Sequence, residues 1–336
     1  MNSCKPVLIG CKHQNIHPLF TIITPTYNQL GWLILCIASV RDQVVSNASN
    51  FSVEHIIQDA GTSGIEDLAR ELGAEFYRDG QLVFKTRDER RETSQQHPKP
   101  ANEDQATYSL KIFSEKDVGM YDAINRGLAR SKGEICAYLN SDEQYLLGTL
   151  DEVWKFFREN SITQILFGDV ILVDSDGGYL CTRIVTIPSK WLTRVHTLSV
   201  FTAATFFRRS LFADRKIFFR SEWKVIGDLI WILDILGAKT SMALMSKRVA
   251  VATETGANLI LSEQSRIESG RFFSSSPWLL KAIKPILVLQ YRFKRLMYGA
   301  YRPPLETYRI YTKEIKEQRT IFLPIRSTYK LEGRFG

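Results

Sequence analysis

The strongest constraint on the fold is an alternation of strand-like and helix-like segments at the start of the chain. The short apolar run 19–24 (LFTIIT) stops at Pro25, and apolar residues at helical spacing follow it over 30–40. A second strand-like run, 53–58, is followed by helical spacing of apolar residues from Ile65. Strand, helix, strand and helix in this order predict a mostly parallel sheet with right-handed crossovers. The predicted fold class is therefore α/β, with helices flanking a central sheet.

A polar stretch, residues 79–107, interrupts this alternation. It is highly charged and contains Pro98 and Pro100, a composition that predicts a flexible surface insertion. A loop that gates a substrate is the alternative interpretation. The alternation then resumes with a predicted strand over 110–114 and a predicted helix over 121–130.

Four more elements are predicted farther along the chain. The run 134–139 predicts a strand, and Thr149-Leu-Asp-Glu152 predicts a capping box at the start of a helix. The segments 163–173 and 179–186 predict a hairpin that turns at Asp176-Gly177-Gly178. The sequence contains no internal repeat.

Polar side chains follow the predicted strands at the points where they end. In an open α/β sheet, ligands bind beyond the carboxyl ends of the strands. Acidic and hydrogen-bonding groups at four such ends predict a polar ligand site that includes a cation. The sequence has no glycine-rich GxGxxG or GxxxxGK loop, so dinucleotide binding and P-loop chemistry lose their main support. The residues at the four ends are Thr26, Tyr27 and Asn28, then Asp59, then Ser114 to Asp117, then Asn140 to Glu143.

Five segments resemble those of family 2 glycosyltransferases. FTIITPTYNQ (20–29) resembles the opening strand of that family, and SEKDVGMYDAINRGLARSKGEICAYLNSDE (114–143) resembles its run from an acidic motif to the metal motif. FGDV (167–170), TFFRRSLF (205–212) and GDLIW (227–231) resemble three later stretches. The resemblance covers about residues 18–260 and implies a GT-A type nucleotide-sugar fold and bacterial-type surface polysaccharide synthesis.

The resemblance also implies a role for each candidate residue. Asp142 corresponds to the metal ligand, and Asp228 to the general base that removes the proton of the acceptor hydroxyl. Asp59 corresponds to the residue that hydrogen-bonds the nucleotide base. The implied donor-binding residues are Pro25, Thr26, Tyr27, Asn28, Asp59, Asp117, Asn125, Asn140 and Ser141; the candidates for contacts with the acceptor or phosphate are Asp169, Arg208 and Arg209.

The sequence departs from the family pattern at three places, and several candidates have a purely structural alternative. Asn140 stands where relatives often carry Asp, Glu143 replaces a frequent second Asp, and the loop 59–64 is altered. Asp59 could form only an Asx turn. Asp228 precedes an apolar helix, where the helix dipole stabilises a carboxylate.

The implied reaction transfers a sugar from a nucleotide-diphosphate donor to an acceptor hydroxyl, with a divalent cation (Mg²⁺ or Mn²⁺) and inversion at the anomeric carbon. The implied acceptor is a saccharide or a lipid-linked saccharide. Two alternatives stay open: a catalytically inactive GT-A subunit of an assembly complex, and a sugar nucleotidyltransferase. The second would need a glycine- and arginine-rich phosphate loop near the first strand, which the sequence lacks.

Composition narrows the class of partner and the compartment. The formal net charge is +8, which favours anionic partners, but the basic residues of the catalytic half are not interleaved with aromatics as in nucleic-acid-binding modules. Five cysteines without a CxxC pair and five histidines without a cluster argue against disulfides and a zinc site. The N-terminal residues lack a signal-peptide core and no apolar run is long enough to span a bilayer, so a cytoplasmic location is expected.

The last part of the chain differs in composition from the rest. We predict a catalytic domain over 18–270 and a basic amphipathic tail over 276–336. Six basic residues and no acidic residue occur in 276–302, together with many aromatic and aliphatic residues. This composition suits the anionic inner face of the plasma membrane. Packing on the catalytic domain or on a second subunit is the alternative, and Pro285 predicts a break or kink in the helix.

Overall fold

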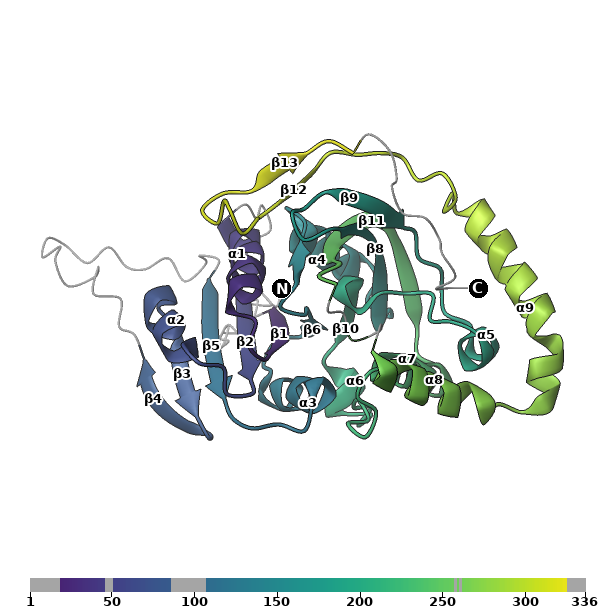
Figure 1. Cartoon of the computed structure of the whole chain (residues 1–336), viewed down its shortest axis with the longest axis horizontal. Helices are drawn as coiled ribbons and strands as arrows, with labels where there is room; N and C mark the ends of the chain where they lie inside the picture. The colour runs from purple at the N-terminus through teal and green to yellow at the C-terminus, as the bar shows by residue number, and fades with distance from the viewer. Residues whose placement is uncertain (1–18, 46–50, 86–106, 257–258, 260–261, 325–336) are drawn as a thin grey trace, which may run out of the picture.

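The structure is a computed structural model that describes residues 19–45, 51–85, 107–256, 259 and 262–324 (Figure 1). Its strands are β1 (Phe20–Thr26), β2 (Val53–Asp59), β3 (Glu75–Arg78), β4 (Gln81–Lys85), β5 (Tyr108–Ser114), β6 (Ile135–Tyr138), β7 (Glu143–Tyr145), β8 (Ile165–Val173), β9 (Tyr179–Arg183), β10 (Thr205–Arg208), β11 (Met242–Thr253), β12 (Tyr308–Ile310) and β13 (Thr320–Phe322). Its α-helices are α1 (Leu30–Val45), α2 (Ile65–Leu72), α3 (Met120–Arg130), α4 (Thr149–Glu159), α5 (Lys190–Val195), α6 (Ser210–Ala213), α7 (Gly227–Gly237), α8 (Glu263–Ser274) and α9 (Trp278–Met297), and η2 (Thr202–Ala204) is a 3₁₀ helix.

One large sheet organises the described part of the chain. Its strand order is β4-β3-β5-β2-β1-β6-β10-β8-β11-β7, and β9 pairs with β8. The block β3-β5-β2-β1-β6 is parallel throughout, and β8 and β11 are also parallel to each other. The antiparallel strand β10 joins these two parts. The predicted α/β class with a mostly parallel central sheet is therefore confirmed.

Helices cover both faces of the sheet because the central strands are apolar on both sides. In β1 all seven residues are buried. Phe20 and Ile22 belong to the core cluster formed with α1 and α4, whereas Ile23 belongs to the cluster formed with α3 and α7. A side chain at Gly127 of α3 would come within 2.5 Å of Ile23, so this glycine allows the helix to lie close against the strand. Full burial on both faces is typical of a parallel central strand.

The structure corrects three local predictions. The predicted insertion 79–107 begins with a hairpin, since Asp79 and Gly80 both have positive φ and connect β3 to β4; residues 86–106 lie outside the described part. Thr149 is not the cap of a capping box: it is the first residue of α4, and its hydroxyl donates to the carbonyl of Val249. Pro285 lies inside α9, which continues past it, so the predicted break does not occur and the kink stays a prediction.

The predicted tail, 276–336, combines two different structures. In Figure 1, α9 runs along one end of the molecule, and β12 and β13 then return across its top beside β9 and β11. Tyr308 and Ile310 of β12 are buried against β8 and β11. No helix among the described residues is both long enough and apolar enough to cross a membrane.

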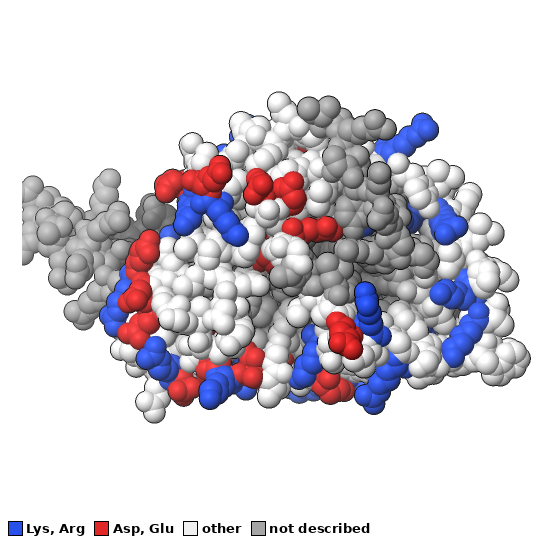
Figure 2. Space-filling view, in the orientation of Figure 1, with Lys and Arg blue, Asp and Glu red and all other residues white. Residues whose placement is uncertain are grey.

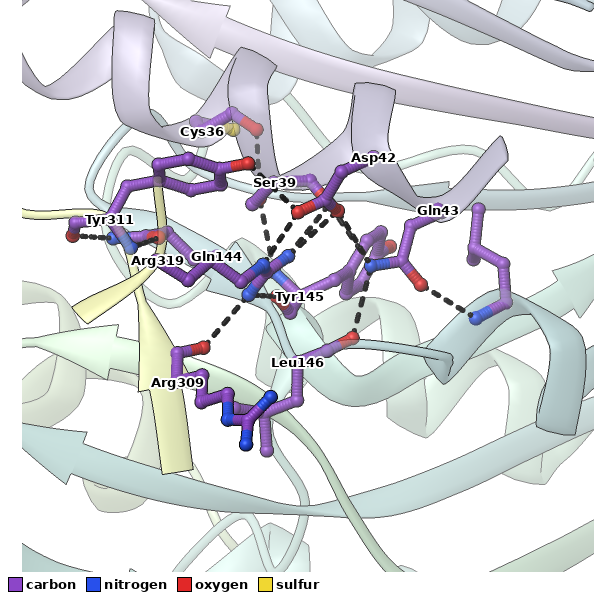
Figure 3. A network of polar contacts seen from close by, with 11 residues as sticks. Cys36, Ser39, Asp42, Gln43, Gln144, Tyr145, Leu146, Arg309, Tyr311 and Arg319 are labelled. Atoms are coloured by element: carbon purple, nitrogen blue, oxygen red, sulfur yellow. Dashed lines mark hydrogen bonds and ion pairs between the residues drawn. The ribbon is translucent and has the colours of Figure 1, made fainter. Parts of the chain in front are cut away.

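A buried arginine of this returning segment binds α1 and the large sheet (Figure 3). The Arg319 side chain is only 7% exposed and forms an ion pair with Asp42 of α1 at 2.6 Å. Its guanidinium also donates to the carbonyls of Ser39, Tyr145 and Arg309. Because a buried guanidinium needs partners for its N–H groups, this network specifies where the segment docks.

Candidate active site

The carboxyl ends of β1, β2 and β5 lie side by side. The strand register pairs Thr26 with Asp59 and Asp59 with Ser114, so the last residues of the three strands form one row. The loops that follow are joined by backbone hydrogen bonds, from the Ala60 N–H to the Thr26 carbonyl at 3.1 Å and from the Glu115 N–H to the Asp59 carbonyl at 2.9 Å. The predicted gathering of these strand ends is what the structure shows.

Asp59 has a different environment from the one predicted. Its side chain is fully buried, and its carboxylate accepts hydrogen bonds from the N–H groups of Gly61 and Thr62 and from the Ser114 hydroxyl at 2.8 Å. The Thr62 hydroxyl in turn accepts the N–H of Asn28, whose φ is +55°. Asp59 therefore holds the two loops together, as an Asx turn does. The predicted contact of its carboxylate with a nucleotide base is not supported by this geometry.

The loop after β6 presents the carboxylate of Asp142. The neighbouring side chains have partners within the protein: the Ser141 hydroxyl donates to Gln29, and the Glu143 carboxylate accepts the N–H of Asn140 at 2.7 Å. Within the described residues, the Asp142 carboxylate accepts a hydrogen bond only from its own backbone. The Asp142 carboxylate is thus left for a ligand.

Two buried oxygen atoms at this edge have no hydrogen-bond partner among the described residues. They are the Thr26 hydroxyl oxygen and the Asn140 side-chain oxygen. Buried polar atoms are nearly always paired in native proteins, and leaving one unpaired costs roughly 1–3 kcal/mol. Unpaired oxygens beside a free carboxylate indicate a site that a polar ligand completes.

Two acidic side chains lie close together in this loop, and each is hard to ionise. Burial raises the pKa of Asp142, and burial together with the charge of Asp142 raises the pKa of Glu143. No group of three His, Cys, Asp or Glu side chains in the described ranges could hold a metal ion. The residues present fit a Mg²⁺ or Mn²⁺ ion that takes one carboxylate from the protein and its other oxygens from water and a substrate diphosphate.

Asp228 lies at the start of α7 and contacts Tyr121 of α3. Its carboxylate accepts the N–H of Leu229 at 2.7 Å and lies 3.4 Å from the Tyr121 hydroxyl, which donates to the Val225 carbonyl at 2.9 Å. A Cβ at Gly227 would lie 2.5 Å from the Tyr121 ring. The glycine of the GDLIW segment therefore lets the tyrosine approach the carboxylate.

Asp228 and the 140–143 loop are close enough to influence each other electrostatically. Burial is the main cause of the raised pKa values of Glu143 and Tyr138; the charge of Asp228 adds to both, and the charge of Glu143 adds to that of Tyr138. Burial raises the pKa of Asp228 itself to about 6. A partly buried carboxylate with a pKa near neutrality suits proton transfer at physiological pH.

Glu268 of α8 positions the start of α7. Its carboxylate accepts the backbone N–H groups of Lys224, Val225 and Ile226, at 2.8, 2.9 and 3.2 Å. These three residues directly precede the helix that carries Asp228. Sequence reasoning missed both Glu268 and Tyr121. Tyr121 shares helical spacing with Ile124 and Leu128, so the sequence indicates that it lies on a buried face, where its hydroxyl needs a hydrogen-bond partner. No such pattern in the sequence indicates a role for Glu268.

Four of the predicted site residues either have other partners or lie elsewhere: Asn125, Arg208, Arg209 and Asp169. The Asn125 side-chain N–H donates to the Phe219 carbonyl at 2.7 Å, and its side-chain oxygen accepts the Phe219 N–H at 3.0 Å. Its amide is therefore not left for a nucleotide-sugar. Arg208 pairs in register with Ile135, the first residue of β6, and binds Glu134. Arg209 follows at the same edge, which is opposite to the carboxyl ends of the parallel strands. Neither arginine can reach the site from there.

Asp169 lies in a separate cavity. It is 6% exposed in β8, accepts the N–H of Val185 at 2.9 Å, and pairs in register with Arg248 of β11. Both line a cavity of about 750 Å³ that β12 also borders. Burial raises the pKa of Asp169 to about 6.

The other predicted donor residues remain at the carboxyl edge. Pro25 lies within β1 opposite Gln58, and Tyr27 is 61% exposed just after the strand. Asp117 accepts the N–H of Gly119 at 2.8 Å, and burial raises its pKa. Their contacts with a donor stay predictions.

Comparison with known proteins points to one class of enzyme. A scan against models of protein families finds no match. Over 162 residues, 48% of this chain, the sequence is 26% identical to a protein of Rickettsia bellii named "Uncharacterized glycosyltransferase", of which the match covers 18%. Over 157 residues it is 27% identical to the "PGL/p-HBAD biosynthesis glycosyltransferase" of Mycobacterium bovis, of which it covers 48%. The chain thus spans at most about half the length of these relatives, and about half of it is similar to proteins named glycosyltransferases.

Solved structures were also compared. The mannosyltransferase PcManGT from Pyrobaculum calidifontis, in complex with GDP-Man and Mn²⁺, matches 87% of this chain and 77% of its own, with 15% identity and a TM-score of 0.47. S. aureus TarS 1-349 in complex with UDP-GlcNAc matches 77% of this chain and 61% of its own, with 15% identity and a TM-score of 0.46. These likenesses are too distant to assign a ligand to this chain.

Proposed function

We propose that the chain is an inverting glycosyltransferase of the GT-A type, family 2, which moves a sugar from a nucleotide-diphosphate donor to an acceptor hydroxyl. The observation that carries the proposal is the arrangement at the carboxyl edge of the sheet. There the Asp142 carboxylate and the unpaired oxygens of Thr26 and Asn140 lie at or just after the ends of β1 and β6, and the charge of Asp228, a carboxylate whose pKa burial raises to about 6, acts on Glu143 of the same loop. The similarity to relatives named glycosyltransferases supports the same class.

The donor side of the site is built from the strand-end loops. Thr26 and Asn140 offer oxygen acceptors that suit the hydroxyl groups of a ribose or an ion-bound water. Asp142 would hold the divalent cation, and a cation bound there would neutralise negative charge on the diphosphate leaving group. Asp59 supports the donor only indirectly, by fixing the loops on which Asn28 and Thr62 lie.

Asp228 acts as the general base. The acceptor O–H transfers its proton to the Asp228 carboxylate while its oxygen forms a bond to the anomeric carbon of the donor sugar. The bond from that carbon to the diphosphate oxygen breaks, and the nucleoside diphosphate leaves with the bonding electrons. Because one displacement occurs on the face opposite the leaving group, the anomeric configuration inverts.

The pathway follows from the resemblance of the sequence. We place the reaction in the cytoplasm, in the synthesis of an exopolysaccharide, O-antigen or lipopolysaccharide, with a saccharide or lipid-linked saccharide as the acceptor. Two described cysteines, Cys36 and Cys136, are free and buried, in keeping with a reducing compartment.

Donor binding tests the proposal directly. The melting temperature of the protein is measured with UDP-, GDP- and dTDP-sugars, each with and without Mn²⁺. Specific binding stabilises the folded state by mass action and so raises the melting temperature. At a ligand concentration about one hundred times Kd, the free energy of unfolding rises by about 2.7 kcal/mol. We expect one nucleotide class to stabilise the wild type only when Mn²⁺ is present.

Two variants separate the metal role from a general loss of charge. Asp142→Asn should lose the Mn²⁺-dependent stabilisation, whereas Glu152→Gln, which removes a surface carboxylate paired with Lys247, should keep it. Retention of metal-dependent binding by Asp142→Asn contradicts the assignment of the ligand. Donor binding by the wild type without transfer to any acceptor would favour an inactive assembly subunit.

A further inference from the structure

Helix α9 carries an apolar surface that no other described element covers. It is 20 residues long, and none of its residues is buried. Its half-buried residues Leu280, Leu287 and Tyr291 recur at helical spacing and face inward, toward α5. On the rest of the helix surface, eight large apolar side chains are between 41% and 73% exposed: Trp278, Leu279, Ile283, Ile286, Leu289, Phe293, Leu296 and Met297.

The position of these residues on the helix is ordered. At 3.6 residues per turn, Leu289, Phe293 and Ile286 fall in the middle of the exposed apolar sector, and Trp278 falls at the end of it that is nearer to Arg292. Lys281 and Arg292 border this sector on one side, and Lys294 borders it on the other. An apolar face flanked by basic residues is the pattern of a helix that lies in a membrane interface.

The charge of the helix is uniformly positive. Residues 276–302 contain six basic residues and no acidic one, and five of the six, Lys281, Lys284, Arg292, Lys294 and Arg302, are exposed. In Figure 2, the edge of the molecule along which α9 runs shows Lys and Arg but no Asp or Glu. This charge is complementary to the anionic headgroups of a lipid bilayer.

Both ends of the helix are fixed to the catalytic domain, so its outward face is presented in one orientation. Before α9, the Ser276 hydroxyl donates to the carbonyl of Arg194, the last turn of α5. After it, the Arg248 side chain donates to the carbonyl of Pro304, and the Tyr308 hydroxyl donates to a carbonyl at the β8–β9 turn. A loose tail would not need contacts at both ends.

We propose that the outward face of α9 docks on an anionic lipid bilayer. A second copy of the chain is a poorer occupant, because in a twofold dimer the same patch meets itself. Two copies of a helix without acidic residues would oppose basic residues with basic residues, which is unfavourable. The helix lies in the headgroup layer, with Trp278 and Phe293 among the acyl chains and Lys281, Arg292 and Lys294 at the phosphates. This inference does not depend on the proposed sugar transfer.

Vesicle binding by the full chain tests the inference. Co-sedimentation is measured with phosphatidylcholine vesicles that contain or lack phosphatidylglycerol, at low and high salt. We expect binding only with phosphatidylglycerol, and weaker binding at high salt. The double substitution Leu289→Glu with Phe293→Glu should reduce binding at least about tenfold, since it places two charges in the apolar face. Ile162→Glu is the matched control, because Ile162 is 82% exposed on a different surface, and it should bind like the wild type.

Three results would overturn the inference. The first is no sedimentation of the wild type with either vesicle. The second is equal binding by the wild type and the double variant, provided that their melting temperatures agree. The third is that sedimentation velocity finds the wild type dimeric and the double variant monomeric, while lipid affects neither. The face would then be an interface between two copies.

Discussion

The charged form of Asp228 should destabilise the folded protein, and this destabilisation can be measured separately from catalysis. Burial raises its pKa from the ordinary 3.8 to about 6. Because one pKa unit corresponds to about 1.36 kcal/mol, this rise bounds the destabilisation by the charged form at about 3 kcal/mol. Asp228 is partly exposed and the unfolded chain is not fully solvated, so we expect Asp228→Asn to stabilise the protein by about 1–2 kcal/mol at neutral pH.

The sign of the pH dependence follows from the direction of the shift. Below 3.8 the carboxyl group is protonated in both the folded and the unfolded state, so it imposes no cost. Between 3.8 and about 6 the folded state binds the proton more tightly, and the cost grows as the pH rises. Above about pH 6 the cost is complete. The stabilisation by Asp228→Asn should therefore be full near about pH 8 and mostly lost near about pH 4.

The assay is urea unfolding of the metal-free protein at both pH values, together with steady-state kinetics. An asparagine at position 228 can still accept the N–H of Leu229 but cannot take a proton, so kcat should fall by about 10²–10⁴-fold. Asp234→Asn is the control on the same helix, since Asp234 forms an ion pair with Arg220 and should give no stabilisation. A variant that is no more stable than the wild type at the higher pH, or equally stabilised at both, would refute the reasoning.

Three further outcomes are expected. The value of kcat/KM should fall about tenfold per pH unit below about pH 6, because only the deprotonated Asp228 can take the proton of the acceptor hydroxyl. Steady-state kinetics in which kcat/KM does not change between about pH 5 and about pH 7 would contradict this. Gly227→Ala should lower both stability and kcat, since the added Cβ would lie 2.5 Å from the Tyr121 ring; calorimetry and kinetics would detect it, and a neutral result would mean that the ring moves freely. Arg319→Met should destabilise the chain by about 3 kcal/mol, because it removes the ion pair with Asp42 and the donors to the carbonyls of Ser39, Tyr145 and Arg309; an unchanged urea midpoint would show that these contacts do not hold the segment in place.

The sequence by itself determined the order of the elements and the edge at which the ligand site forms. Strand-like runs are apolar throughout, helices repeat their apolar residues every three or four positions, and both signals are local. Since parallel strands end at one edge of a sheet, Thr26, Asp59, Ser114 and Asn140 could be assigned to the same place before any coordinates. The hairpin at 79–80 was also readable, because Asp-Gly is a common two-residue turn.

The tertiary structure alone decided which of these side chains remain available to a ligand. Asp59 and Asn125 were predicted to contact the ligand, but both bind residues that are distant in the sequence. Asp59 accepts the hydroxyl of Ser114, and Asn125 donates to the carbonyl of Phe219. Arg208 lies on β10, whose antiparallel direction places it at the opposite edge. Strand direction and the pairing of buried polar groups depend on contacts between distant segments, which local periodicity does not encode.

The contact of Tyr121 with Asp228 and the hydrogen bonds from residues 224–226 to Glu268 also depend on contacts between distant segments. They join α3, α7 and α8, and their geometry follows from how these helices pack. The exposure of α9 was equally beyond the sequence, which predicted its charge and apolar residues but not which face is covered. A pattern specifies that a face is apolar, but only packing decides whether protein or another phase covers it.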